Sequence, residues 1–193
     1  MEARHEIQND PHPQVLELLA DLRLKQKEPV EAAELYELGL KHSPDHVPWL
    51  KGLATAYLKG FDYERLRPVL ERLAVADGDN AAVRKKLAQM TLEDEAFAEA
   101  VRYARLALQI DVLDVETHQI LARSYAGLKQ FGKSVEEWAI ALKLKPDALD
   151  VEVELARAEA AAGKKESART RLDKLLEREP DYDAAQKLRD ELD

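Results

Sequence analysis

A fixed spacing of 34 residues constrains this sequence more than any other feature. A Leu-Ala pair recurs five times at that spacing, with no insertion between copies: Leu19-Ala20, Leu53-Ala54, Leu87-Ala88, Leu121-Ala122 and Leu155-Ala156. A second position, small or apolar in every copy, follows the same period: Ala32, Leu66, Ala100, Ser134 and Ala168. Self-similarity at a period of roughly 20–50 residues is typical of an array of structural repeats. Five units fit the chain without a gap: 13–46, 47–80, 81–114, 115–148 and 149–182.

Within a unit, the apolar residues follow a helical period. In the fourth unit they lie at i, i+1, i+4 and i+7, which is one face of an α-helix: Leu121, Ala122, Tyr125 and Leu128. A second apolar stripe follows the short polar break at Lys129-Gln130: Val135, Trp138, Ala141 and Leu142. Pro146 then ends the pattern, because proline cannot donate to the helical ladder. Each unit is therefore predicted to be two antiparallel helices joined by short loops, and no segment has the pattern of a strand.

The units resemble the tetratricopeptide repeat family in the residues at its characteristic positions. The fourth unit matches through His118, Leu121-Ala122, Tyr125, Ser134, Trp138, Ala141 and Pro146. The second matches through Leu50, Leu53-Ala54, Tyr57, Leu66, Leu70, Leu73 and Gly78. Some units depart from the pattern. The family usually has an aromatic residue at the positions of Arg23, Thr91 and Glu159, and Trp or Leu at those of Arg84 and Glu152. The resemblance implies an all-α fold, a right-handed superhelical solenoid of antiparallel helix pairs.

The two ends of the chain differ from the repeats. Residues 183–193 carry an apolar stripe that includes Leu188 and Leu192, as expected of a C-terminal capping helix that covers the last repeat. Residues 1–12 are polar and are expected to be an N-terminal tail or loop. Because the N-terminal end has the weaker cap, one hypothesis is that the chain is a segment of a longer protein.

Composition excludes several classes of function. The sequence has no cysteine, which excludes disulfides, thiolate zinc sites and thiol nucleophiles. Its net charge of −9 argues against nucleic acid as a partner. No apolar run is long enough to span a membrane, and no signal peptide is visible. A soluble protein, cytoplasmic by default and without a cofactor, is expected.

No motif for catalysis or metal binding stands out. The glycines never cluster into a phosphate-binding loop. His42 and His46 are four residues apart, but Pro44 between them places them across a turn, where solvated loop residues are expected. The acidic run 93–95 lacks the glycine and the spaced ligands of a calcium loop. We therefore expect neither a catalytic nor a metal site, and an enzyme would need clustered ligands that the sequence does not show.

Three aromatic or histidine side chains could be mistaken for binding residues. Trp138 occupies a second-helix position that Tyr36 and Leu70 fill in other units, so it is expected in the core. Trp49 lies at a junction between units and is expected to pack there. His118 occupies a repeat position and is expected to be a packed or interface histidine.

The family resemblance implies that partners bind on a concave groove lined by the first helix of each unit. Carried over unit by unit, the central line of that groove contains Lys51, Thr55, Lys85, Gln89, Gln119, Arg123 and Arg157. This line holds no acidic residue, although Glu17 and Asp21 make its N-terminal end acidic. A basic stripe favours an acidic protein or peptide as the partner. The alternative is a solvated helix face, because Lys, Arg and Gln are good helix formers.

One specialised use of the family's groove is excluded by the residues. Some members are co-chaperones that clamp a carboxyl-terminal peptide with Lys and Asn side chains. Lys51 matches the first Lys, but Thr55 and Lys86 replace the Asn residues, and Glu116 and Ile120 replace the final basic pair. The prediction is therefore a protein-interaction scaffold or adaptor of another specificity, and the alternative is a structural repeat segment that positions another domain.

Overall fold

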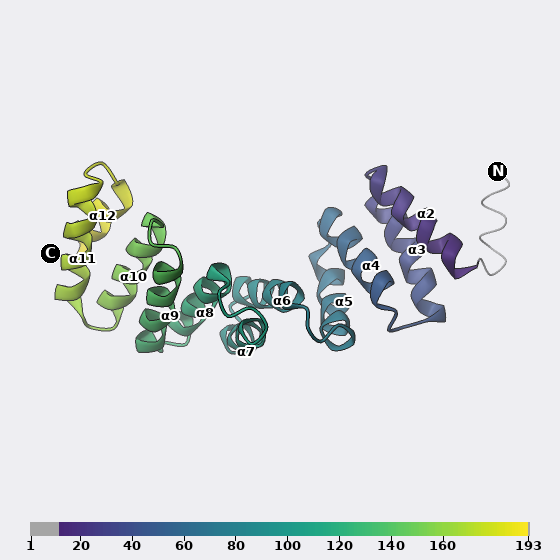
Figure 1. Ribbon diagram of the computed structural model, residues 1–193, viewed down its shortest axis with the longest axis horizontal. Helices are drawn as coiled ribbons and strands as arrows, with labels where there is room; N and C mark the ends of the chain where they lie inside the picture. The colour runs from purple at the N-terminus through teal and green to yellow at the C-terminus, as the bar shows by residue number, and fades with distance from the viewer. Residues whose placement is uncertain (1–11, 193) are drawn as a thin grey trace. The chain divides into compact units, whose positions relative to one another are not determined.

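The structure is a computed structural model that describes residues 12–192 (Figure 1). Within these residues the chain folds into helices alone, and no strand occurs, which confirms the all-α prediction. The helices, in chain order, are α2 (Pro13–Lys25), α3 (Pro29–His42), α4 (Val47–Lys59), α5 (Tyr63–Ala76), α6 (Ala81–Glu93), α7 (Phe97–Leu108), α8 (Val115–Gly127), α9 (Phe131–Leu144), α10 (Leu149–Ala161), α11 (Lys165–Arg178) and α12 (Asp183–Glu191). The N-terminal tail predicted for residues 1–12 lies, except for His12, outside the described residues.

Local sequence signals explain where several helices begin. Pro29 lies in the first turn of α3 and Pro48 in that of α4, where the missing N–H of proline costs no hydrogen bond. Asp62 and Asp114 precede α5 and α8 as N-caps, and each accepts a hydrogen bond from a backbone N–H of the first turn. The polar residues between the apolar stripes therefore act as helix boundaries, as the sequence predicts.

The turn inside each repeat has the same backbone conformation five times. One residue per turn has a positive φ, in the left-handed region: Lys27, Phe61, Glu95, Lys129 and Gly163. At the fourth of these turns, the Lys129 N–H donates to the carbonyl of Ala126 at 2.9 Å, and the Gln130 N–H donates to that of Tyr125 at 2.8 Å. These two bonds satisfy carbonyls that the end of α8 would otherwise leave unpaired. The sequence predicts the break but not its geometry, because glycine, which favours this conformation, occupies only one of the five places.

The described part of the chain divides into two compact units, and the division lies between residues 83 and 84. In the first unit, α2 packs on α3, α3 on α4, and α4 on α5. Trp49 is buried at the α3–α4 junction, where Gly39 leaves space for its ring. Gly52 accommodates the ring of Tyr36 in the same way. The predicted packing of Trp49 between two repeats is confirmed.

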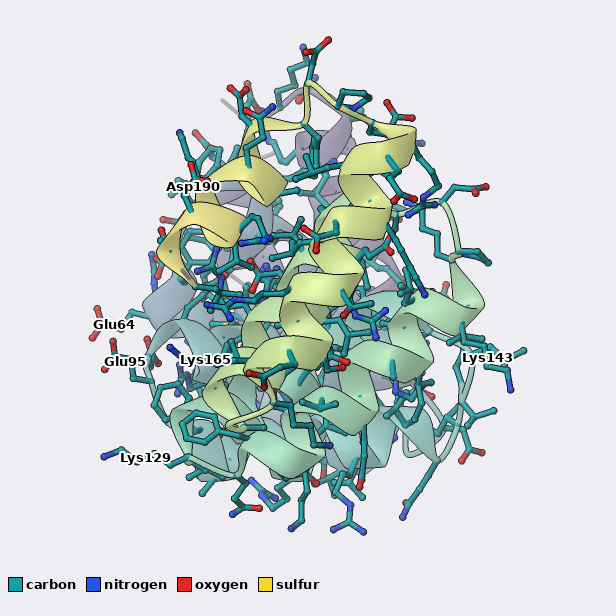
Figure 2. The ribbon with its side chains drawn as sticks, turned by 90° about the vertical axis from the view of Figure 1, so that its left-hand side faces the viewer. Glu64, Glu95, Lys129, Lys143, Lys165 and Asp190 are labelled. Atoms are coloured by element: carbon teal, nitrogen blue, oxygen red, sulfur yellow. The ribbon has the colours of Figure 1, made fainter. Side chains whose placement is uncertain are left out.

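Two apolar clusters lie in the second unit. Trp138 packs with Ala122, Leu155 and their neighbours, which confirms its predicted place in the core. The other cluster joins α10 and α11 to α12 through residues that include Leu172 and Leu188. Helix α12 thus covers the last helix pair. Charged side chains on the outside of the unit, such as those of Lys143 and Lys165, point outward (Figure 2).

Candidate interaction surface

The residues of the predicted groove all lie at the surface of first helices. Helix α4 carries Lys51 and Thr55, α6 carries Lys85 and Gln89, α8 carries Gln119 and Arg123, and α10 carries Arg157. None of the seven is buried. Two belong to the first unit and five to the second. The structure therefore places the residues on the expected helices, and their union into one continuous groove stays a prediction.

In the first unit the groove residues are already paired. The Lys51 Nζ lies 2.8 Å from the Oδ2 of Asp77, and the Thr55 hydroxyl donates to the Lys51 carbonyl at 2.8 Å. The predicted acidic end is also engaged. The indole N–H of Trp49 donates to Glu17 at 3.3 Å, and the Tyr36 hydroxyl donates to Asp21. These two carboxylates therefore fix buried aromatic rings at the junction between repeats.

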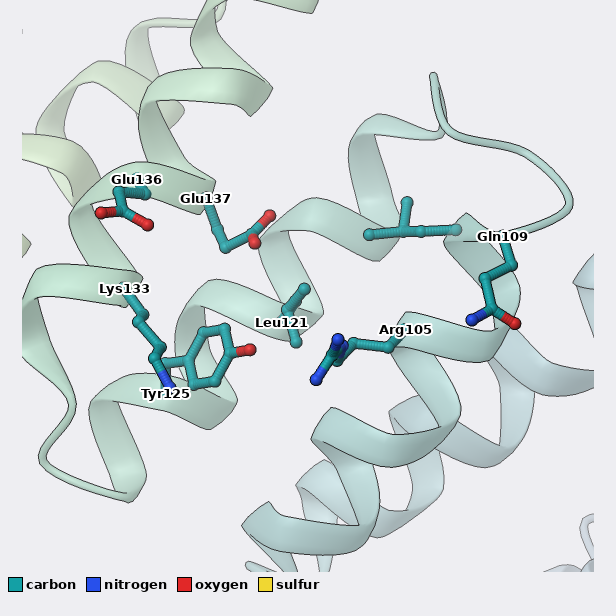
Figure 3. A pocket seen from close by; sticks show the side chains of 8 residues that line it. Arg105, Gln109, Leu121, Tyr125, Lys133, Glu136 and Glu137 are labelled. Carbon is teal, nitrogen blue, oxygen red and sulfur yellow. The ribbon is translucent and has the colours of Figure 1, made fainter.

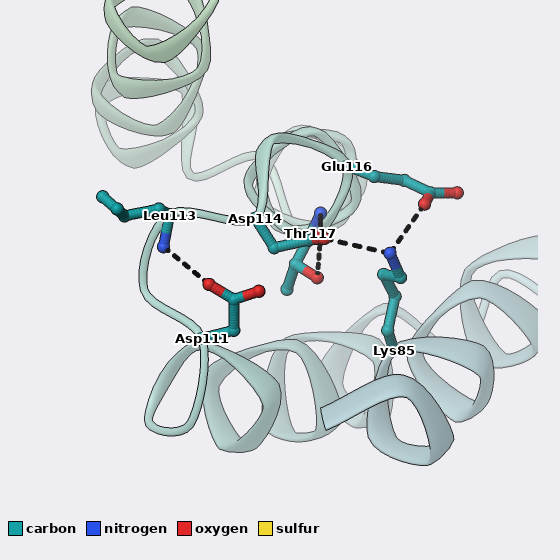
Figure 4. A network of polar contacts seen from close by, with 6 residues as sticks. All are labelled: Lys85, Asp111, Leu113, Asp114, Glu116 and Thr117. Carbon is teal, nitrogen blue, oxygen red and sulfur yellow. Dashed lines mark hydrogen bonds and ion pairs between the residues drawn. The ribbon is translucent and has the colours of Figure 1, made fainter. Parts of the chain in front are cut away.

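In the second unit, Lys85 lies between two carboxylates (Figure 4). Its Nζ lies 3.0 Å from the Oδ2 of Asp114 and 2.9 Å from the Oε2 of Glu116. Burial opposes the charge on Lys85, but the hydrogen bonds to Glu116 and Asp114 outweigh it and raise the pKa of Lys85 above its ordinary value. Burial likewise acts to raise the pKa of Asp114, and the hydrogen bonds from Thr117 and Lys85 outweigh it and lower that pKa. Lys85 is therefore held between two carboxylates.

Arg157 and Arg123 have different surroundings. The Arg157 guanidinium lies 3.5 Å from Glu154, one helical turn earlier, and 3.8 Å from Glu191 on α12. The Arg123 guanidinium lies over the ring of Trp138, 5.6 Å from its centroid. Arg123 therefore makes a cation–π contact in a stripe whose other cations are paired with carboxylates.

Most of the cations in the predicted line are paired with carboxylates, although the line itself contains no acidic residue. Its carboxylate partners come from positions outside the line. The i, i+3 spacing of Glu154 and Arg157 could have been read from the sequence. Asp77, Asp114 and Glu191 could not, because they reach the stripe from loops or from another helix.

Three surface grooves lie between successive second helices, away from the predicted stripe. Each has a floor made of two leucines that recur with the repeat: Leu40 and Leu53, Leu108 and Leu121, and Leu142 and Leu155. The groove between α7 and α9, of about 480 Å³, has polar walls that include Arg105, Tyr125 and Lys133 (Figure 3). The groove between α9 and α11 is larger, about 810 Å³, and more apolar. The sequence does not predict these grooves, although the period of the leucines is visible in it.

The other candidate residues of the sequence lie in exposed turns. Within residues 12–192, no three His, Asp or Glu side chains are grouped as a metal ion would require. His42 and His46 are exposed at their turn, and the acidic run 93–95 is exposed as well. Among the same residues, no helix is long and apolar enough to cross a bilayer.

Some repeat positions hold buried polar or charged side chains that find partners between the helices. The Nδ1 of His118 lies 2.7 Å from Glu137, and its Nε2 lies 3.0 Å from the Val112 carbonyl. Arg171 donates two hydrogen bonds to Glu159, at 3.0 and 2.9 Å. These groups lie in the packing between helices and satisfy one another, which explains how the repeat tolerates them. The prediction that His118 is packed is confirmed.

Comparisons with known proteins agree with this architecture. Residues 23–90 match the model of the tetratricopeptide repeat family. None of the curated proteins matches the chain. Among solved structures, one described as "YrrB: a TPR protein with an unusual peptide-binding site" has a TM-score of 0.81, at 18% identity and with 97% of each chain covered.

Structures of MamA share the fold. One superposes with a TM-score of 0.77, at 18% identity, with 87% of this chain and 92% of that chain covered. Another, from Desulfovibrio magneticus RS-1, has a TM-score of 0.72, at 17% identity, with 89% and 97% covered. At such identities the likeness speaks for the fold alone. Together with the five 34-residue periods and the paired helices, the family match shows that the chain belongs to the tetratricopeptide repeat proteins.

Proposed function

We propose that this protein is an interaction scaffold or adaptor, and that its first-helix face binds a segment of a partner protein. One observation carries the proposal. On α8, the Leu121-Ala122 pair is buried, whereas Gln119 and Arg123 on the same helix remain at the surface. The same division recurs on α6 with Lys85 and Gln89. On α10, Arg157 is likewise at the surface, but Val153, which takes the place of Gln119, is buried. Helices α6, α8 and α10 thus each offer at least one polar side chain at a repeating position. A structure similar in fold is described as having a peptide-binding site, which fits this use.

Within the proposed surface, Arg123 is the side chain best suited to contact a partner carboxylate. Lys85 and Arg157 already have carboxylate partners, so an acidic segment would have to displace those partners. Arg123 instead lies over the Trp138 ring. A guanidinium held by an aromatic ring keeps its N–H donors available at its edge for a carboxylate. We therefore infer a partner with at least one acidic residue that faces the middle of α8.

The test is affinity capture with a charge reversal at one residue. Arg123→Glu is expected to abolish capture of the partner that the wild-type chain retains, and added salt is expected to weaken wild-type capture. Arg102→Glu is the matched control. Arg102 also lies over an aromatic ring, Tyr103 at 4.1 Å, but on the second helix α7. If both variants capture the partner like wild type, the stripe is a solvated helix face and the proposal is wrong.

A second candidate function is to position another domain, as a repeat segment of a larger protein would. The outer face of α2 supports it. Three aliphatic side chains on that face are exposed, at 46, 71 and 47%: Val15, Leu18 and Leu22. Their i, i+3 and i+7 spacing forms one apolar stripe, which suits packing against another folded domain. A variant with Leu18→Glu and Leu22→Glu separates the two functions. Loss of a partner that Arg123→Glu still captures would assign binding to α2.

We also propose the repeat boundaries given by the sequence, with residues 183–193 as the cap. The support is that each of the five 34-residue units contains one pair of helices, and that Leu188 and Leu192 of the last segment are buried against α10 and α11. Deletion of 183–193 is expected to expose Leu172 and Leu175. The loss of two buried leucines costs on the order of 3 kcal/mol. An unchanged denaturation midpoint would contradict this assignment.

A further inference from the structure

One of the turns between repeats differs from the others. Four of these turns are polar and contain Asp together with Pro or Gly: 43–46, 77–80, 145–148 and 179–182. The turn between α7 and α8 instead exposes three aliphatic side chains, Ile110 at 42%, Val112 at 64% and Leu113 at 66%. We call residues 110–113 the apolar ridge. Clustered exposed aliphatic side chains are typical of a surface that a partner covers.

The apolar ridge is held in a fixed conformation by polar contacts (Figure 4). The Leu113 N–H donates to the Oδ1 of Asp111 at 3.2 Å. Asp114, the next residue, accepts from the Thr117 N–H and pairs with Lys85. The Val112 carbonyl lies 3.0 Å from the Nε2 of the buried His118. A segment ordered in advance loses little conformational entropy when it binds, which suits an anchor.

The same unit also contains a groove with an apolar lining, which lies between α9 and α11. Its apolar lining includes Ala139, Leu142, Pro146 and Leu155. Lys143 on α9 and Lys174 on α11 stand at its walls. Within residues 12–192, neither lysine ammonium lies in an ion pair with a carboxylate, whereas Arg171 and Arg178 in the same groove are paired with Glu159 and Glu152. The groove therefore offers an apolar floor between two available cations.

We propose that the apolar ridge of one molecule docks in the α9–α11 groove of a second copy of this chain. The ridge supplies Ile110, Val112 and Leu113 for the apolar floor, and the exposed carboxylate of Asp111 suits the positive charges of Lys143 and Lys174. Because the two surfaces differ, the contact is heterologous. Each added copy leaves one ridge and one groove open, so further copies can be added head to tail. This inference concerns surfaces apart from the first-helix stripe and does not depend on the proposed function.

The test is sedimentation velocity on the whole chain over a wide range of concentration. The wild-type chain is expected to form species larger than a dimer as concentration rises. Two variants each remove one half of the contact: Val112→Ser with Leu113→Ser removes the ridge, and Lys143→Glu with Lys174→Glu removes the groove. Each variant alone is expected to remain monomeric. An equimolar mixture is expected to form a dimer that grows no further, because one intact ridge meets one intact groove.

Matched control substitutions change the same residue types elsewhere. Val75→Ser alters an aliphatic side chain that is 85% exposed on α5, and Lys129→Glu with Lys165→Glu alters two exposed lysines outside the groove. Both controls are expected to assemble like wild type. The recovery of dimers in the mixture shows that both test variants are folded. A wild-type chain that stays monomeric, a test variant that assembles like wild type, or a mixture that stays monomeric would each overturn the proposal.

Discussion

The second and fifth repeats fill the same two buried positions with opposite chemistry. The second repeat has Leu50 and Tyr57, and the fifth has Glu152 and Glu159. All four residues are buried. The Tyr57 hydroxyl donates to Glu37 of the preceding repeat, so even the aromatic solution ends in a carboxylate contact. The repeat therefore determines which positions are buried, and a charged residue is accepted there when a partner satisfies it.

In the fifth repeat, the partners come from α11. Arg171 donates two hydrogen bonds to Glu159, and Arg178 donates one to Glu152 at 2.5 Å. Burial acts to raise the pKa of Glu159, but the hydrogen bonds from Arg171 outweigh it and lower that pKa. The same pair raises the pKa of Arg171. These charged residues thus stabilise the helix pair, and we assign them no binding or catalytic role.

The largest effect is expected when the buried pair loses its cation. Arg171→Met leaves Glu159 buried without its partner, which costs about 3 kcal/mol of unfolding free energy. Arg178→Met is the control. Glu152 is buried like Glu159, but its partner Arg178 is 53% exposed, so water reaches this ion pair and its loss is expected to cost about 1 kcal/mol or less. Urea denaturation followed by circular dichroism measures both. Equal losses in the two variants would show that burial does not govern the cost.

A second substitution tests the same rule at an apolar position. Ala122 is fully buried beside Trp138, whereas Ala126, one turn later, is only partly buried. Overpacking by Ala122→Leu is expected to cost roughly 1–3 kcal/mol, and Ala126→Leu to cost less. Thermal unfolding compares the two variants. Similar melting temperatures would mean that the assigned buried face of α8 is wrong.

Acid provides a smaller, reversible perturbation of the fifth repeat. The folded-state pKa of Glu159 lies below its ordinary value of 4.5, so the unfolded chain binds this proton more readily. The stabilisation is therefore complete above pH 4.5 and is lost as the pH falls through the lower, folded-state pKa. The unfolding free energy of wild type should fall more steeply over this window than that of a variant with Glu159→Leu and Arg171→Met. Parallel pH profiles would contradict the assignment.

The smallest effect is expected at Ser134, whose position holds Ala or Leu in the other repeats. Its hydroxyl is buried and, within the described part of the chain, has no hydrogen-bond partner. Ser134→Ala is therefore expected to leave the unfolding free energy unchanged or to raise it by up to about 1 kcal/mol. Ser124→Ala is the control, because the equally buried Ser124 hydroxyl donates to the Ile120 carbonyl at 2.7 Å. A loss at Ser134 equal to that at Ser124 would point to a missed contact.

The helix pairs could be predicted from the sequence because their signal is periodic. The Leu-Ala pair recurs in every repeat, and Pro146 marks the end of a second helix. The helices of the structure follow both signals. The left-handed turns could not be predicted, because four of the five lack glycine and look like ordinary polar breaks. The carboxylates that pair with Lys51 and Lys85 come from loops that only the fold brings near. The leucines that line the second-helix grooves recur visibly in the sequence, but the grooves themselves could not be predicted, because each is lined by three helices.

A double-mutant cycle between Glu159 and Arg171 measures whether these two buried residues satisfy each other. The cycle compares the unfolding free energies of wild type, Glu159→Leu, Arg171→Met and the double variant. If the pair takes the place of an apolar contact, each single variant is destabilised and the double variant recovers much of the loss. The predicted coupling is about 2 kcal/mol or more. Single losses that simply add, with coupling near zero, would show that the two residues are not partners in the folded chain.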